Sequence, residues 1–258
     1  MKYYVVSDLH SFYTPFMKAL EESGFFTDSE PHKLIICGDL FDRGNEPLEI
    51  EKAVSEFLDG GDAILIRGNH EDLMVEMLDF LEKTDDPFSI LGTHFERNGT
   101  LKTLCDITGR PLEDVLTKPM EVVSEMRRTV AYTKLFPAAR DFFETSHYVF
   151  VHGFIPCREI NEGFGAPLPT FNDWRNGNTV DWNCARWMDY LKAITYGIRV
   201  PGKTVVCGHR SVRYGNADYL GITDPEHVYD PFYYDGIIAI DATTVLSGKV
   251  NCLVIEDD

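Results

Sequence analysis

Five short polar segments, each placed just after an apolar run, constrain the fold of this chain more than any other feature. They are Asp8-Leu9-His10, Gly38-Asp39-Leu40-Phe41-Asp42-Arg43-Gly44, Arg67-Gly68-Asn69-His70-Glu71, Val151-His152-Gly153 and Gly208-His209. Apolar runs this short are typical of buried strands. In open sheets with helical crossovers, the segments that follow the strands meet beyond their carboxyl ends. We therefore expect segments far apart in the sequence to converge on one site.

The first third of the chain alternates between strand and helix patterns. Strands are predicted at residues 3–6, 34–37 and 63–66, and helices at residues 15–22, 47–58 and 72–83. This order favours right-handed crossovers and a largely buried sheet. Strand patterns return at residues 148–151, 204–207, 236–241 and 250–255. The sequence thus predicts an α/β fold.

Two segments interrupt this strand rhythm. Residues 84–147 lack strong strand patterns and contain helical pieces at residues 112–116 and 120–136. We interpret them as a helical cap inserted into a single domain that spans residues 1–258. Residues 153–190 are rich in Gly, Pro, Asn and Trp and predict long active-site loops, with Asp189 at the end of a possible helical turn. Both segments are expected to wall the site.

Composition narrows the classes of partner. Of the 258 residues, 44% are apolar and 26% are charged, which is ordinary for a globular protein. The formal net charge is -18. Nucleic acids and anionic membranes require clustered Lys and Arg, so neither is an expected partner. No apolar run is long enough to span a bilayer, and no signal peptide is recognisable. The six cysteines form no Cys-x-x-Cys pair, which favours free thiols. We expect a cytoplasmic protein.

The polar segments supply a mixed set of metal-binding side chains. They are Asp8, His10, Asp39, Asn69, His152 and His209. Asp8 and His10 are two residues apart, so on extended backbone they point the same way. The number and mix suit two adjacent divalent cations that share one carboxylate, and paired metals most often hydrolyse phosphate esters. Donors without thiolate suit manganese, iron or zinc and disfavour copper(I).

The five segments together resemble the calcineurin-like metallophosphoesterase superfamily. Within it they are most similar to the phosphoprotein phosphatase branch, which includes serine/threonine phosphatases and bacterial diadenosine tetraphosphate hydrolases. The family pattern runs Asp-x-His, Gly-Asp-x-x-Asp-Arg-Gly, Arg-Gly-Asn-His-Glu, His-Gly and Gly-His, and all five parts are present. The resemblance implies a four-layer αββα sandwich, in which helices flank two packed mixed β-sheets.

The resemblance also implies a role for each residue. Asp8, His10 and Asp39 would hold the first metal, and Asp39, Asn69, His152 and His209 the second. A hydroxide bridging the metals would attack phosphorus directly, His70 would give a proton to the leaving oxygen, and Asp42 would orient His70. Arg43 and Arg67 would grip the phosphate. The family's further arginine is expected after His152, with Arg186 as the candidate and Arg175 as the alternative. Two divalent ions are implied, with manganese favoured and iron or zinc as alternatives.

Several functions remain open from the sequence. The favoured one is a serine/threonine protein phosphatase-like phosphomonoesterase acting on a phosphorylated protein, a phosphopeptide or a small phosphate ester. A dinucleoside polyphosphate hydrolase or a phosphodiesterase is the alternative. A catalytically inactive scaffold is disfavoured because His70 and every ligand are present. A nuclease is disfavoured by the net charge of -18.

Overall fold

The first third of the chain builds one sheet from parallel strands and helical crossovers. The computed structural model describes residues 1–159, 167–168 and 174–258. The elements run β1 (Lys2–Val6), α1 (Tyr13–Glu22), β2 (His32–Cys37), α2 (Pro47–Asp59), β3 (Ala63–Ile66) and α3 (Asn69–Lys83). A short 3₁₀ turn, η1 (Phe25–Thr27), follows α1. The strand β11 (Leu253–Glu256) completes the sheet in the order β11-β1-β2-β3 and is antiparallel to β1. The predicted alternation is confirmed.

A second sheet comes from the last part of the chain. Its strands are β4 (Phe143–Glu144), β5 (Tyr148–Phe150), β8 (Thr204–Cys207), β9 (Phe232–Tyr234) and β10 (Ile237–Ala239). The order is β4-β5-β8-β10-β9, with parallel pairing in the middle and antiparallel pairing at both edges. The short strands β6 (Arg158–Glu159) and β7 (Pro167–Leu168) form a separate pair.

Apolar side chains on both faces of the strands explain the layered packing. Val5 and Ile35 point into a core shared with Phe150 and Val206 of the second sheet. The intervening residues of β1, such as Tyr4 and Val6, face the opposite way and pack with the flanking helices. The predicted architecture of two mixed sheets flanked by helices is therefore confirmed.

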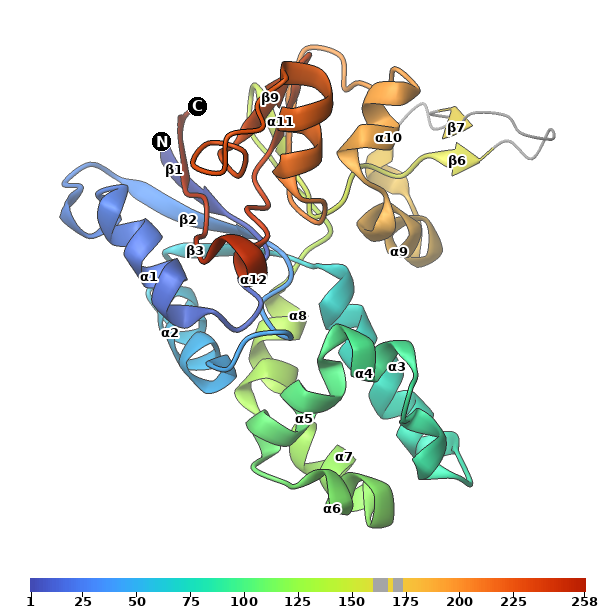
Figure 1. Ribbon diagram of the computed structural model, residues 1–258. Helices are drawn as coiled ribbons and strands as arrows, with labels where there is room; N and C mark the ends of the chain where they lie inside the picture. Colours follow the sequence, from blue (N-terminus) through green and yellow to red (C-terminus); the bar gives the residue numbers. More distant parts are fainter. Residues whose placement is uncertain (160–166, 169–173) are drawn as a thin grey trace.

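Residues 84–147 include β4 of the second sheet and, before it, a group of short helices that projects away from the sheets (Figure 1). They are η2 (Pro87–Ile90), α4 (His94–Asn98), α5 (Thr100–Thr108), α6 (Leu112–Thr117), α7 (Pro119–Met126), the π-helical turn η3 (Ala131–Leu135) and α8 (Phe136–Ala138). The single helix predicted over residues 120–136 is wrong, because α7 ends at Met126. There the Thr129 hydroxyl donates to the Met126 carbonyl at 2.8 Å and accepts from the Tyr132 N–H at 3.3 Å. Such side-chain bonds compete with the helical ladder.

The predicted loops after residue 153 are partly helical. They contain η4 (Trp174–Asn176), α9 (Thr179–Trp187) and α10 (Tyr190–Thr195). Asn178 caps α9 by accepting from the Val180 N–H at 2.8 Å. Asp189 accepts from the Lys192 N–H at 2.9 Å, so it begins α10 rather than ending a helical turn. The rest of this predicted loop, residues 160–166 and 169–173, lies outside the described residues.

Two further helices, α11 (Val212–Leu220) and α12 (Thr244–Ser247), follow β8 and β10. All six cysteines are free thiols, but only Cys37 and Cys207 are buried. Across the described residues, no helix combines the length and apolar character that crossing a membrane would require.

Candidate active site

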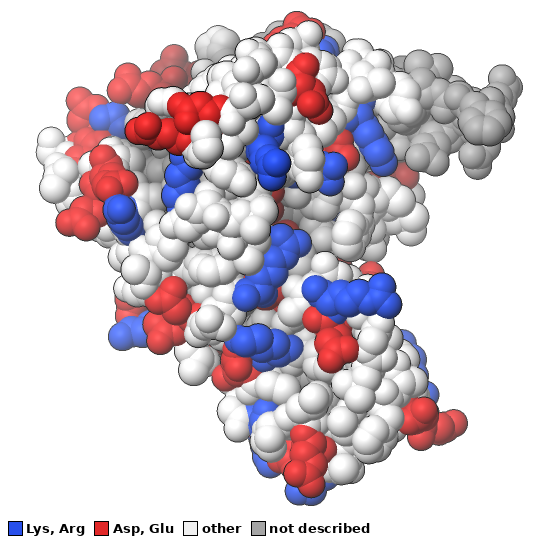
Figure 2. Space-filling model, viewed as in Figure 1, with Lys and Arg blue, Asp and Glu red and all other residues white. Residues whose placement is uncertain are grey.

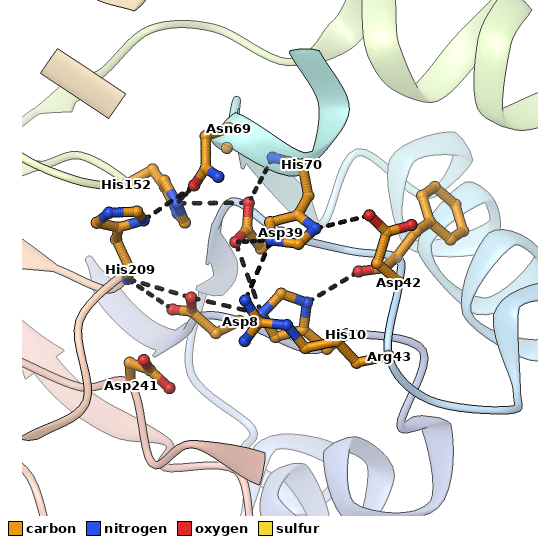
Figure 3. Close-up of polar contacts among 12 residues, drawn as sticks. Asp8, His10, Asp39, Asp42, Arg43, Asn69, His70, His152, His209 and Asp241 are labelled. Carbon is orange, nitrogen blue, oxygen red and sulfur yellow. Dashed lines mark hydrogen bonds and ion pairs between the residues drawn. The ribbon is translucent and has the colours of Figure 1, made fainter. Parts of the chain in front are cut away.

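The six predicted metal ligands converge at one end of the two sheets (Figure 3). Asp8 and His10 follow β1, Asp39 follows β2, and Asn69 is the first residue of α3. His152 and His209 follow β5 and β8. All are buried except His209, which is partly exposed. The polar segments that follow these strands therefore converge, as the sequence predicts.

Asp8, His10 and Asp39 form one group of converging donor atoms. A backbone carbonyl can only accept, so the His10 Nδ1–H donates to the Phe41 carbonyl at 2.9 Å. Burial lowers the pKa of His10 well below its ordinary value, so Nε2 carries a lone pair. Nε2 lies 3.9 Å from Asp8 Oδ1 and 3.6 Å from Asp39 Oδ2. Three side chains that can each offer a lone pair thus face one another.

His152, Asn69, His209 and Asp39 form a second group. The His152 Nδ1–H donates to the Cys37 carbonyl at 2.8 Å, and burial lowers the pKa of His152. Its Nε2 lone pair lies 2.8 Å from Asn69 Oδ1 and 3.4 Å from Asp39 Oδ1. His209 Nδ1 lies 2.9 Å from Asn69 Oδ1, and burial lowers the pKa of His209 to about 2. Neutral imidazoles and oxygen acceptors therefore meet here as well.

Two neighbouring cations fit this arrangement. Asp39 takes part in both groups, because Oδ2 faces His10 and Oδ1 faces His152. Buried lone pairs that oppose one another cost free energy unless a cation lies among them. Burial also raises the pKa of Asp8 to about 6 and raises that of Asp39. A bound cation favours the ionised carboxylates and so removes that penalty.

His70 lies beside both groups, on the first turn of α3. Its Nδ1–H donates to Asp42 Oδ2 at 2.6 Å, which directs Nε2 toward the metal-ligand groups, 3.8 Å from Asp39 Oδ2. Arg43 Nη2 lies 3.3 Å from the same Nε2. Burial alone would lower the pKa of His70, but Asp39 and Asp42 outweigh it, and the pKa is raised. The ring can therefore carry a proton next to the ligands, held in place by a carboxylate.

Arg67 and Arg186 are joined through one carboxylate. Arg67 Nε donates to Asp72 Oδ1 at 2.6 Å, and Arg186 Nε donates to Asp72 Oδ2 at 2.5 Å. The buried Arg186 also donates to Asp141 at 2.7 Å and to Asn183. These side chains line a cavity of about 640 Å³ beside α3 and α9. Both guanidinium groups thus have protein partners.

Arg175, the alternative to Arg186, lies elsewhere. Its Nε donates to Glu144 at 2.6 Å, and its guanidinium carbon lies 4.4 Å from the centre of the Trp174 ring. Arg43 is exposed and contacts His70. Of these two arginines, the structure brings Arg43 to the site.

Glu71 links two of the polar segments by hydrogen bonds, a role that the sequence did not reveal. Its buried carboxylate accepts the backbone N–H groups of Asp39 at 3.1 Å, Leu40 at 2.9 Å and Gly68 at 2.7 Å. These bonds fix the segment after β2 against the start of α3, and hence Asp39 against Asn69. The available signal was an acidic residue in the first turn of a helix, where N–H groups lack helical partners.

Left-handed backbone is concentrated at the same segments. In the described part of the chain, residues with positive φ include Asp8 (53°), His10 (46°), Asp39 (56°), Asp42 (76°), Arg43 (63°) and His209 (64°). Side chains of L-residues rarely adopt this region, and each instance costs on the order of 1–3 kcal/mol. Gly38 has φ 81°, and a Cβ there would lie 2.6 Å from His152 Nδ1. The surrounding contacts, rather than local preference, therefore hold the ligands.

Asp241 is a further buried carboxylate at the site, two residues after β10. It lies near Asp8 and His209 (Figure 3) and accepts from the Thr243 N–H at 2.6 Å. Burial, with Asp8 nearby, raises the pKa of Asp241 to about 8. The strand predicted over residues 236–241 would include Asp241, but β10 ends at Ala239, so the residue lies at the edge where the other polar segments meet.

Asp241 gives the metal-free protein a pH-dependent stability. Between about pH 4 and pH 8 the folded state holds a proton on Asp241 that the unfolded state has lost, so stability falls as pH rises through this window. We expect Asp241→Asn to flatten the fall in urea midpoint between pH 5 and pH 8. The exposed Asp218→Asn should leave the slope of the parent protein unchanged. Equal slopes for Asp241→Asn and the parent would contradict the assignment.

The rim of the site is more basic than the molecule as a whole. Lys and Arg side chains gather along the junction between the sheets and the projecting helices (Figure 2). Arg43 and the exposed Arg210 both lie close enough to oppose the rise in the pKa of Asp241. A phosphate can therefore approach the site despite the net charge of -18.

Comparison with known proteins shows a similarity that extends beyond the five polar segments. The model of the calcineurin-like phosphoesterase family matches residues 1–238. No match to a curated protein was found. Among solved structures, the cold-active protein-tyrosine phosphatase of a psychrophilic Shewanella species has 13% identity over 99% of this chain and 75% of that chain, with a TM-score of 0.50. A protein described provisionally as a diadenosine tetraphosphatase has 15% identity over 98% of this chain and 89% of that chain, with a TM-score of 0.48. At these identities the likeness concerns the fold alone.

Proposed function

Because this chain belongs to the calcineurin-like phosphoesterase family, we propose that it is a two-metal phosphohydrolase with serine/threonine protein phosphatase-like phosphomonoesterase activity. The observation that carries the proposal is the position of the His70–Asp42 pair. Asp39 takes part in two groups of potential metal-binding atoms, one with His10 and His70 and one with His152 and His209, and Asp42 holds the His70 ring there. Two-metal hydrolysis of a phosphate ester uses a pair of cations with a proton donor beside them.

The ligand sets of the proposal follow the two donor groups. Asp8, His10 and Asp39 would hold one divalent ion, and Asp39, Asn69, His152 and His209 the other, with manganese proposed for both. When bound, the ions would activate water and offset charge on the phosphoryl oxygens. The hydrogen bonds from His10 to Phe41 and from His152 to Cys37 engage Nδ1 of each ring, so Nε2 would be the nitrogen available to an ion.

His70 and Arg43 would act directly on the substrate. His70, protonated at Nε2, would give its proton to the leaving oxygen while Nδ1–H stays on Asp42. Arg43 is exposed and can turn from His70 to a phosphoryl oxygen. Arg67 and Arg186 stay candidates for phosphate binding, but each would have to exchange its bond to Asp72. We therefore rank Arg43 first.

We further propose that residues 84–147 are an insertion within one domain and form one wall of the site. A phosphomonoester on a protein side chain is favoured over a polyanionic dinucleotide because the net charge is -18. A dinucleoside polyphosphate hydrolase is the second candidate. Trp187, 49% exposed, stands edge-on to His209 with ring centres 5.8 Å apart, where a nucleobase could stack.

Initial rates on a phosphopeptide and on diadenosine tetraphosphate separate these two candidates. One manganese-loaded preparation is used for both substrates, with His70→Asn as the control. We expect faster turnover of the phosphopeptide, lost in the control. Faster turnover of the dinucleotide would establish the second candidate. If the protein hydrolysed neither substrate, nor p-nitrophenyl phosphate or its bis-ester, the remaining interpretation would be a catalytically inactive scaffold.

A further inference from the structure

Asp42 has a second hydrogen-bond donor, which comes from the projecting helices. Thr100, the first residue of α5, places Oγ1 2.6 Å from Asp42 Oδ2. The same oxygen accepts from His70 Nδ1 at 2.6 Å. Thr100 is fully buried, and an ionised carboxylate can only accept. The hydroxyl therefore donates to the oxygen that also holds the His70 ring.

The surrounding backbone is shaped for this contact. Gly99, with φ 91°, approaches the Asp42–Gly44 turn so closely that a Cβ would lie 2.7 Å from the Arg43 backbone nitrogen. Two residues beyond Thr100, the Lys102 ammonium donates to the Gly44 carbonyl at 3.1 Å. The start of α5 is thus docked on the turn that carries Asp42, by two hydrogen bonds and a close backbone approach.

The turn itself needs outside support. Asp42 and Arg43 have φ values of 76° and 63°, which non-glycine residues rarely adopt. The Gly44 N–H donates to the carbonyls of His10 at 2.8 Å and Asp42 at 2.7 Å, which fixes the backbone but not the carboxylate. Two donors on one oxygen, Thr100 and His70, define the orientation of that carboxylate.

We propose that Thr100 is a positioning residue for the His70–Asp42 pair, so that residues 84–147 contribute to proton donation as well as to the wall of the site. The inference rests on the proposed role of His70 as proton donor. Thr100 does not touch the substrate; it fixes Asp42, and Asp42 fixes the ring. Removing the Thr100 hydroxyl should therefore lower the rate most on substrates whose leaving oxygen most needs a proton.

Leaving-group dependence tests this role. Thr100→Val keeps the shape and removes the hydroxyl, whereas Thr100→Ser keeps the hydroxyl. We expect Thr100→Val to lower kcat roughly 10-fold on phenyl phosphate, a poor leaving group, as for other orienting partners. On 2,4-dinitrophenyl phosphate the loss should be less than about 2-fold, because proton donation matters little there. Thr100→Ser should restore the phenyl phosphate rate.

Thr108→Val is the matched control, because its hydroxyl bonds the Leu104 carbonyl within the same helix at 2.6 Å. Thr100→Ala replaces Thr100→Val if the valine variant does not fold, as judged by its melting temperature. Equal losses on both esters, no loss on either, or no rescue by serine would overturn the positioning role while the parent enzyme still turns over both substrates. If the parent protein hydrolyses neither ester, the proposed function fails and the positioning role fails with it.

Discussion

Replacing His70 with asparagine is expected to lower kcat by about 10²–10⁴-fold, the usual contribution of a positioned general acid. Asparagine can keep a hydrogen bond to Asp42 but has no proton to give at the position of Nε2. The ring nitrogen that is lost lies 3.8 Å from Asp39 Oδ2 and groups with His10 and Asp39, but Asp42 holds the ring through Nδ1 and the role proposed for it is that of proton donor rather than ligand. Bound manganese should therefore stay at two ions per chain, measured by atomic emission on the same sample.

The matched control for this prediction is His227→Asn. His227 is exposed, and its Nδ1 pairs with Asp230 at 3.0 Å, on the surface of the molecule. This variant should keep the parent kcat. Full activity of His70→Asn would remove the proton-donor role, and loss of manganese from it would instead make His70 a ligand.

Asp39→Asn should have the largest effect on metal binding. Asp39 Oδ2 faces His10 at 3.6 Å and Oδ1 faces His152 at 3.4 Å, so the carboxylate serves both donor groups. Asparagine can present its single oxygen to only one of the two donor groups. It would turn its NH₂ toward the second donor group, and it lacks the negative charge of the carboxylate. Removing a residue that only hydrogen-bonds to a metal ligand typically lowers metal affinity roughly 10–100-fold. We therefore expect Asp39→Asn to lower manganese affinity by more than about 100-fold. Activity should fall with it.

Calorimetric titration with manganese measures this loss directly. Asp42→Asn is the control, since Asp42 contacts His70 and Thr100 instead of the donor groups. It should bind two ions with the parent affinity while losing activity. Retention of both ions at parent affinity in Asp39→Asn would contradict a shared carboxylate.

The strands and the convergence of the polar segments that follow them were predictable, because each depends on a short pattern. Runs such as the one from Leu34 to Cys37 are apolar on consecutive positions, as a strand buried on both faces must be. Asp39 and His152 follow such runs directly, so strand ends gave their positions. Asp241 was not identified because the apolar pattern over residues 236–241 predicts a strand that includes it, whereas β10 ends at Ala239.

The remaining contacts depend on tertiary structure, which no local pattern encodes. Thr100 reaches Asp42 across 58 positions of sequence, and nothing in the residues around it distinguishes it from an ordinary helix start. The residues of α9 have weak helix preference, so their sequence predicts a loop, yet Trp182 and Ala185 are buried and stabilise the helix by packing. Positive φ at Asp39 is likewise supported by a partner distant in the sequence, because the Asp39 N–H donates to Glu71.

The position of β1 has a consequence for how the protein is made. This strand lies between β2 and β11, and its register places Lys2 opposite Glu256. The ribosome therefore delivers one partner of β1 early and the other only when residues 253–256 emerge. For most of synthesis the outer edge of β1 presents unpaired backbone groups, which invites pairing with other nascent chains. The segment carrying Asp8 and His10 follows that same strand, so the sheet that positions these two side chains is complete only after β11 has paired.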